Sequence, residues 1–332
     1  MKKSLIALAV LAVSGAAFAQ STVTLNGRVD AWVGTLKNTP AGETQTKLDN
    51  GGLTGSRWAL NGTEDLGGGL KAMFKLENRF NVDDGTSAGQ FLGDAYLALA
   101  GGFGTVKLGR TYTAFDDTRV LGNSKNVFDS ALTPVGDVFK GTVGGIDYTS
   151  RAPSGIRYET PNMSGFSASL TYAFGENKTA TTSSDDLKAL SLKYAAGPVS
   201  VAYGYQEEMA GGTTSNKYNH IAGVYDFGVA AVSAGYGKRS GTAVTGDDSG
   251  YTLGVTAPVS KALTVSLGYA KEDTDIAGVT TLKSSGWGLG AGYSLSKRTT
   301  MYAGYKATDG ENAAGTKVNE VRLFAVGVRH DF

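Results

Sequence analysis

The chain has 332 residues, with 31 Lys and Arg against 30 Asp and Glu, and its formal net charge at pH 7 is +1. This balance makes nucleic acid an unsuitable partner, because nucleic-acid binding needs clustered positive charge. The absence of cysteine excludes disulfides, thiolate metal sites and a cysteine nucleophile. The 48 glycines do not follow the period of collagen, and a hydrophobic fraction of 41% is too high for a disordered chain.

The N-terminal segment has the three parts of a secretory signal peptide. It begins with two lysines, continues with an apolar run over residues 5–18, and ends in a small-x-small sequence at Ala19. We therefore expect a cleaved signal at residues 1–19, export through the Sec pathway, and one mature domain of residues 20–332. After the signal, no apolar run approaches the roughly 18 residues of a membrane-spanning helix.

Short alternating segments follow from Val23 onward. In "VTLNGRVDAW", Val23 and Leu25 lie on one face of an extended strand, whereas Arg28 and Asp30 lie on the other. "LKAMFKLENRF" and "LTVSLGYAKE" repeat this pattern. Each strand is predicted to have one apolar face and one polar face.

Sixteen such segments are separated by turn signals. They begin near Val23, Arg57, Leu70, Asp94, Thr105, Gly155, Phe166, Lys188, Val199, Asn219, Val229, Gly250, Leu263, Ser285, Thr300 and Val318. The connections alternate between tight turns such as "DLGGG" and longer polar loops. An even number of strands with short turns at one end and long loops at the other predicts an all-β, sixteen-stranded antiparallel transmembrane barrel. A soluble β-sandwich is the alternative, but it would not place charge so often opposite its apolar face.

The last strand, "VRLFAVGVRHDF", alternates up to the terminal Phe332. Backbone groups in lipid need partners within the protein, so this strand is expected to pair with the first and close the barrel. Phe332 would then face lipid near the periplasmic interface. The three tryptophans, Trp32, Trp58 and Trp287, are expected in aromatic girdles.

The sequence resembles the general porins of Gram-negative outer membranes, most closely those of β-proteobacteria. The resemblance is carried by "VTLNGRVDAW", "SRWALNGTEDLGGGLKAMFKLE", "GTVKLGRTYT", "IRYETPNMSGF" and the terminal "GVRHDF". It implies an outer-membrane homotrimer surrounded by lipid and lipopolysaccharide. It also implies a third loop, from about residue 111 to 150, that folds into the pore, and recognition of Phe332 by the barrel-assembly machinery.

The pore wall is expected to be basic. The alternation places Arg28, Arg57, Lys71, Lys75 and Arg79 on the lumen side of the first three strands. The resemblance adds Arg110 and Arg151 to the wall of the constriction. Arg110 is in register with outward-facing residues, so an inward direction would require a β-bulge or the end of a strand.

The long third loop supplies the expected opposing charges. Its carboxylates are Asp116, Asp117, Asp129, Asp137 and Asp147. The sequence departs from the family pattern in two places, since no Glu follows Pro134 and Gly93-Asp94 stands where an arginine is often found. A basic wall without that loop Glu favours a weakly to moderately anion-selective pore.

Several other functions are open to such a barrel. A substrate-specific channel for phosphate or small organic anions is the first alternative, with the arginines as its binding track. A barrel enzyme, either a lipase or a protease, is less favoured because the chain has only two histidines, His220 and His330, and no nucleophile motif. An adhesin would be expected to have longer loops. No cofactor or metal is expected, and acidic pairs such as Asp247-Asp248 are interpreted as solvated loop charges rather than a Ca²⁺ site.

Overall fold

The structure is a computed structural model that describes residues 21–39, 42–87, 89–125, 131–139, 148–212, 214–241, 246–276 and 278–332. The expected signal peptide at 1–19 lies outside these ranges, as do Asp129 and Asp147. Within them, the strands are β1 (Thr22–Lys37), β2 (Gln45–Asn50), β3 (Arg57–Gly67), β4 (Leu70–Arg79), β5 (Ala95–Gly101), β6 (Gly104–Tyr112), β7 (Arg151–Glu159), β8 (Phe166–Ala173), β9 (Leu187–Ala196), β10 (Val199–Ala210), β11 (Thr214–Asp226), β12 (Ala231–Gly241), β13 (Gly246–Pro258), β14 (Leu263–Ile276), β15 (Val279–Ser294), β16 (Thr299–Asn312) and β17 (Lys317–Asp331). The helices are α2 (Asp116–Asn123) and α3 (Val135–Val138). No helix in these ranges has the length and apolar character needed to cross a membrane.

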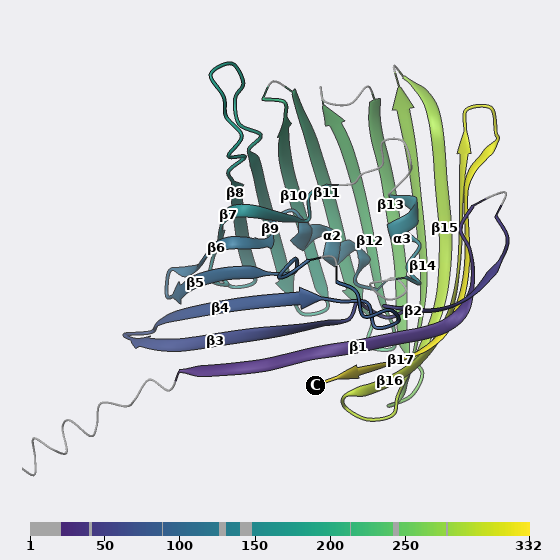
Figure 1. The fold of residues 1–332 in the computed structure, drawn as a ribbon, viewed down its shortest axis with the longest axis horizontal. Helices are drawn as coiled ribbons and strands as arrows, with labels where there is room; N and C mark the ends of the chain where they lie inside the picture. The colour runs from purple at the N-terminus through teal and green to yellow at the C-terminus, as the bar shows by residue number, and fades with distance from the viewer. Residues whose placement is uncertain are drawn as a thin grey trace, which may run out of the picture.

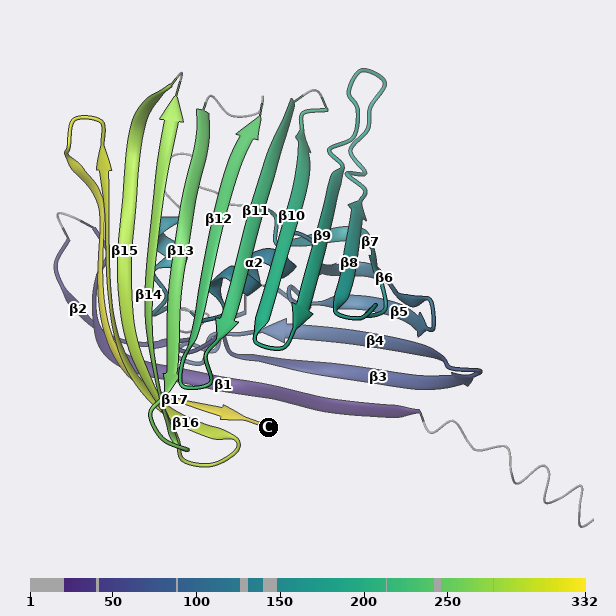
Figure 2. The same ribbon diagram turned by 180° about the vertical axis from the view of Figure 1, so that it is seen from behind.

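The strands form one closed antiparallel barrel (Figures 1 and 2). From β3 onward each strand pairs with the next, and β17 returns to pair with β1. Both β2 and β3 pair with the same edge of β1, β2 along residues 31–36 and β3 along residues 22–28. They therefore share one strand position, and the prediction of a sixteen-stranded barrel is confirmed.

The outer face of the barrel is apolar, as the alternation predicts. Leu25, Phe166 and Leu267 are each more than half exposed, and they come from strands far apart around the ring. In an isolated barrel, exposed apolar side chains that recur around the ring form the surface that lipid covers. Trp287 also lies on this face at 45% exposure. Trp32 does not, because it shares the inner face of β1 with Asp30 and packs against Leu132 and Tyr302 at only 4% exposure.

The chain terminus closes the ring where the sequence predicts it. The Phe332 N–H donates to the Gly27 carbonyl, and the Gly27 N–H donates to the Phe332 carbonyl, both at 3.0 Å. The ring of Phe332 lies over the bare backbone of Gly27, since a Cβ there would be 2.5 Å from its Cζ atom. An aromatic ring covering a glycine on the neighbouring strand is a recognised way to stabilise a strand pair.

We expect Gly27→Ala to destabilise the barrel by about 1–3 kcal/mol, because the added methyl group displaces the Phe332 ring at the closing seam. Urea unfolding of the detergent-solubilised protein, followed by tryptophan fluorescence, measures the change. Gly223→Ala is the matched control, since a Cβ there has its nearest neighbour at 3.7 Å. Equal unfolding midpoints for the two variants would contradict the expected role of this contact.

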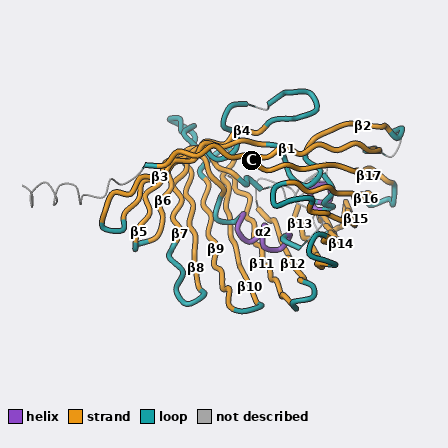
Figure 3. The backbone as a smooth tube through the Cα atoms, turned by 90° about the horizontal axis from the view of Figure 1, so that it is seen from below, coloured by secondary structure: helices purple, strands orange, loops and turns teal. Residues whose placement is uncertain are grey.

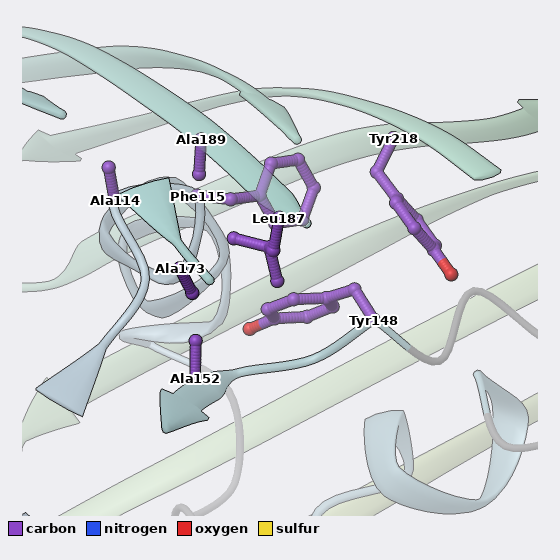
Figure 4. Close-up of a cluster of buried hydrophobic side chains, with 8 residues drawn as sticks. All are labelled: Ala114, Phe115, Tyr148, Ala152, Ala173, Leu187, Ala189 and Tyr218. Carbon is purple, nitrogen blue, oxygen red and sulfur yellow. The ribbon is translucent and has the colours of Figure 1, made fainter. Parts of the chain in front are cut away.

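The two helices in the described part of the connection from β6 to β7 pack against strands of the sheet. Helix α2 contacts β9 to β13 (Figure 3). Helix α3 contacts β14 to β16. Phe115, just before α2, lies with its ring centroid 4.7 Å from that of Tyr148 and 6.1 Å from that of Tyr218 (Figure 4). Tyr218 points away from the exposed face of β11, on which Ile221 lies. Aromatic packing thus attaches this connection to the wall.

Asp30 attaches a second segment to the inner wall. Its carboxylate accepts hydrogen bonds from the backbone N–H groups of Gly52 at 3.1 Å and of Leu53 and Thr54 at 2.9 Å. It also accepts a bond of 2.5 Å from the Tyr302 hydroxyl in β16. Asp30 is fully buried, and these four hydrogen-bond donors replace the water that would otherwise solvate its carboxylate. The turn between β2 and β3 is thereby fixed inside the barrel.

Candidate pore lining

Strand register brings the basic residues of the first strands together. Arg28 in β1 is directly opposite Arg57 in β3, and Arg57 is directly opposite Arg79 in β4. Directly paired residues point to the same face of a sheet, so these three side chains lie side by side on the inner wall. With their neighbours they form what we call the basic cluster: Arg28, Arg57, Lys75, Arg79, Arg110 and Arg151.

Two carboxylates from the wall itself separate these cations. Glu77 is 3.0 Å from both Lys75 Nζ and Arg79 Nε, and 3.9 Å from an Arg57 nitrogen. Asp94, which directly precedes β5, is 2.9 Å from Lys75 Nζ and 3.3 Å from Arg151 Nε. Like charges at this density would repel one another without such counterions.

Arg110 reaches the cluster through a break in strand register. The pairing of β6 with β7 shifts between Gly109 and Thr111, and Gly109 has a φ of +127°. A Cβ at Gly109 would lie 2.4 Å from the Ala95 carbonyl oxygen, so only glycine fits this bulge. The Arg110 guanidinium then donates to the Leu92 and Arg151 carbonyls. The sequence indicated that Arg110 could face the lumen only at a β-bulge or a strand end, and the bulge lies at this position.

Arg151 is the most firmly held cation of the cluster. Its guanidinium lies 3.4 Å from the centroid of the Tyr112 ring, which fixes it by a cation–π contact in addition to its pair with Asp94. An open hollow of about 440 Å³ lies in front of it, and Arg28, Arg57 and Lys75 also line this hollow. The hollow has room for a hydrated ion beside several fixed positive charges.

Four cations of the cluster are more exposed than Glu77 and Asp94, whereas Arg151 is only 9% exposed. The side chains of Arg28, Arg57, Lys75 and Arg79 are 23–35% exposed, whereas those of Glu77 and Asp94 are 5% and 10% exposed. The carboxylates lie against the wall and the basic groups extend over them. A passing ion therefore meets mainly positive charge, because six cations face three carboxylates: Glu77, Asp94 and Asp331, the last of which lies 3.4 Å from Arg28 Nε.

The acidic residues of the β6–β7 connection are bound to the wall on which that connection packs. Asp117 accepts from Arg157 at 2.8 Å and from Ser169 at 2.7 Å. Asp137 is paired with Lys306 at 2.5 Å. Asp116 accepts a short hydrogen bond from Tyr148, and burial raises the pKa of its carboxyl above the ordinary value. None of these three is paired with a member of the basic cluster in the described part of the chain.

The sequence interpretation missed the partners of these charges. It gave Glu77 no role, although the i−2 and i+2 neighbours of Glu77 are Lys75 and Arg79, a spacing that puts all three on one face. It gave no role to Arg157 or Lys306. Their pairs with Asp117 and Asp137 join distant parts of the chain, so no local pattern could have indicated them.

A comparison with protein families decides what this barrel is. A family model described as "Gram-negative porin" matches residues 4–313. The chain belongs to the Gram-negative porin family. Membership confirms the predicted resemblance and places this porin in the outer membrane of a Gram-negative cell. The family is one of channels rather than of enzymes.

Relatives of this porin include β-proteobacterial proteins. It is 41% identical over 210 residues to outer membrane porin protein 32 of Delftia acidovorans, an alignment that covers 61% of this chain and 58% of that one. It is 35% identical over 181 residues to major outer membrane protein P.IB of Neisseria lactamica, covering 53% and 51%. The chain thus aligns with somewhat more than half of the length of these curated relatives. Among solved structures, the anion-selective porin from Comamonas acidovorans superposes with a TM-score of 0.80 at 30% identity, covering 94% of this chain and all of that one.

Proposed function

We propose that this porin lets ions and small hydrophilic solutes diffuse passively through a water-filled channel, with a preference for anions. The observation that carries the proposal is the basic cluster, in which six cations outnumber their three paired carboxylates, Glu77, Asp94 and Asp331. Fixed charge of one sign on a pore wall raises the local concentration of the opposite ion and thereby sets which ion carries the current. The similarity to an anion-selective porin supports the same sign.

We propose that the β6–β7 connection narrows the pore opposite this cluster. Its described part packs on β9 to β16, whereas the basic cluster comes from β1 and the strands and connections from β3 to β7. Asp117 is paired with Arg157 of β7 and Asp137 with Lys306 of β16, so their charges are largely neutralised. The field across the pore would then come from the basic side alone. This arrangement strengthens the anion preference relative to a pore with unpaired loop carboxylates.

Planar-bilayer recording of the purified protein tests the proposal directly. We expect stepwise conductance. Across a KCl gradient, the sign of the zero-current potential should show that chloride is more permeant than potassium. A zero-current potential of the opposite sign would contradict the anion preference, and an absence of conductance would contradict the channel itself. Lowering the salt from 1 M to 0.1 M should sharpen the preference, because the Debye length grows from about 3 Å to about 10 Å.

Asp94 is expected to weaken the anion preference, since it adds a negative charge between Lys75 and Arg151. Asp94→Asn should raise the chloride-to-potassium permeability ratio by about two- to threefold, as one net positive charge is added to the wall. Asp65→Asn, at an exposed position near the end of β3, is the matched control and should leave the ratio unchanged. A ratio in Asp94→Asn that does not exceed that of the control would show that this carboxylate lies outside the ion path.

A substrate-specific channel for phosphate or small organic anions is the second candidate. The cluster supports it because arginine guanidinium groups bind such anions through two parallel hydrogen bonds. Conductance that saturates with phosphate or a small carboxylate, but not with chloride, would favour this function over general diffusion. An enzyme is not proposed, since His220 is covered by α2 whereas His330 bonds to Thr299 at the start of β16.

We also propose that the porin assembles as a homotrimer in contact with lipid and lipopolysaccharide, after export through the Sec pathway. Phe332 is proposed as the residue by which the barrel-assembly machinery recognises the chain. Its position supports this role, because its ring is 44% exposed on the outer face at the closing seam. Cross-linking in native membranes and export of a Phe332→Ser variant would test the two assignments separately.

A further inference from the structure

We propose that His220 makes the packing of α2 sensitive to acid: a proton on its imidazole loosens α2 from the barrel wall and alters ion flow. Only the effect on ion flow rests on the proposed function. The attachment of α2 to the wall is a property of the barrel, and it is measurable without any current.

Glycines form the space around the imidazole. The direct cross-strand partners of His220 in β11 are Gly204 in β10 and Gly237 in β12. A Cβ on Gly122 of α2 would lie 3.0 Å from His220 Cε1, and one on Gly235 would lie 2.9 Å from Nε2. Helix α2 and the wall therefore enclose the ring from both sides, and neither side leaves room for the ring to move away.

The enclosed ring has little polar support. His220 lines a cavity of about 20 Å³ together with Phe115, Arg119, Asn123 and Tyr148. Among the described residues, neither its buried Nδ1 atom nor Asn123 Oδ1 has a hydrogen-bond partner. A cavity of this size holds one water molecule at most, which cannot solvate an ion. His220 is only partly buried, but its Nδ1 atom is shielded from solvent, which disfavours the imidazolium because that form carries a proton on both ring nitrogens.

The charges around the ring do not compensate a proton. The titratable groups near it are Arg119 and Asp116 of α2, Tyr148 of the same connection, and Tyr218 of β11. Arg119 is a cation, and Asp116 already accepts the hydrogen bond from Tyr148. Strands β12 and β13 contribute Gly235 and the neutral Thr252 at this point. A protonated His220 would thus be a second cation beside Arg119, and the released helix would allow water to reach both.

The sign of the effect follows from linkage. A histidine in water gains its proton near pH 6.5, and the docked state of α2 resists that proton. The ratio of docked to undocked α2 therefore falls by up to about tenfold for each pH unit below that value. Asp116 acts in the opposite direction, because burial raises the pKa of its carboxyl and protonation then favours docking. Its ordinary range lies near pH 4, so measurements from pH 7.5 to 5 emphasise His220.

A spin label on α2 tests the proposal. The chain has no cysteine, so Val120→Cys, at a position of α2 that is 54% exposed, provides a single labelling site. Labelled barrels are compared in three backgrounds: unchanged, His220→Gln and His330→Gln. His330, the second histidine, is exposed and bonded to Thr299, and it serves as the matched control. We expect a mobile component to grow between pH 7.5 and 5 in the unchanged and His330→Gln barrels, and to be absent in His220→Gln.

Three outcomes would overturn the proposal. The first is an equal acid response in His220→Gln, and the second is no response in the unchanged barrel. The third is a label that is mobile at pH 7.5 in both His220→Gln and His220→Asn, which would mean that the imidazole only fills space. Bilayer currents recorded in parallel separate this proposal from the proposed channel function. A barrel without conductance at pH 7.5 would contradict the channel function, whereas the spin label would still report whether α2 is docked.

Discussion

Replacing Arg57 and Arg151 together by glutamine is expected to remove most of the preference for anions, lowering the chloride-to-potassium permeability ratio by about tenfold at 0.1 M salt. Both side chains line the hollow of the basic cluster, and the substitution leaves Glu77 and Asp94 with two fewer cations. The formal charge of the cluster, counted with Glu77, Asp94 and Asp331, then falls from +3 to +1. The zero-current potential across a KCl gradient measures this change.

Two comparisons make this expectation specific. Lys297→Gln removes a cation from the exposed turn between β15 and β16, away from the cluster, and should leave the ratio unchanged. Raising the salt to 1 M should reduce the difference between the double variant and the unchanged porin, because screening shortens the reach of wall charges to about 3 Å. A double variant that still favours chloride as strongly as the Lys297→Gln control would place the selective charges elsewhere in the pore.

Much of the barrel was predictable because the residue pattern that specifies its strands is local in the sequence. Alternation of apolar and polar residues marks every strand that crosses the apolar zone, and strand starts such as Arg57, Leu70 and Val199 were predicted correctly. The missed features lie where this rule does not apply. Strand β2, Gln45–Asn50, is mostly polar, and β15 begins at Val279 rather than near Ser285. At these ends of the barrel, backbone pairing continues where no outer apolar face is required, so alternation carries no signal.

The arrangement of the pore charges was predictable only in part. Alternation placed Arg28, Arg57 and Arg79 on one face, and strand register then brought them side by side. The location of Glu77 and Asp94 beneath the cations depends on side-chain packing, which alternation does not describe. The pairs that bind Asp117 and Asp137 depend on where a long connection settles on distant strands. Such contacts are set by the closed barrel as a whole and not by any segment of the sequence.

Replacing Asp30 by alanine is expected to have the largest effect on stability of any single change considered for this porin. The buried carboxylate satisfies three backbone N–H groups in the turn between β2 and β3, and the Tyr302 hydroxyl. Each buried donor left without an acceptor costs about 1–3 kcal/mol, so the turn should detach rather than remain in place with its donors unpaired. Urea unfolding and hydrogen exchange at Gly52, Leu53 and Thr54 measure the global and the local loss.

The detached turn should also affect the pore, because the two inner segments support each other. The Ala131 N–H donates to the Gly51 carbonyl at 3.1 Å, and Leu53 packs with Leu132 and Trp32. Loss of the turn therefore removes one support of the β6–β7 connection, and we expect noisier open-channel current in Asp30→Ala. Asp49→Asn, a neutralised carboxylate in the neighbouring β2, keeps the turn attached and serves as the control. If Asp30→Ala retained slow exchange at these amides and quiet current, the turn would be held by the packing of Leu53 and not by the carboxylate of Asp30.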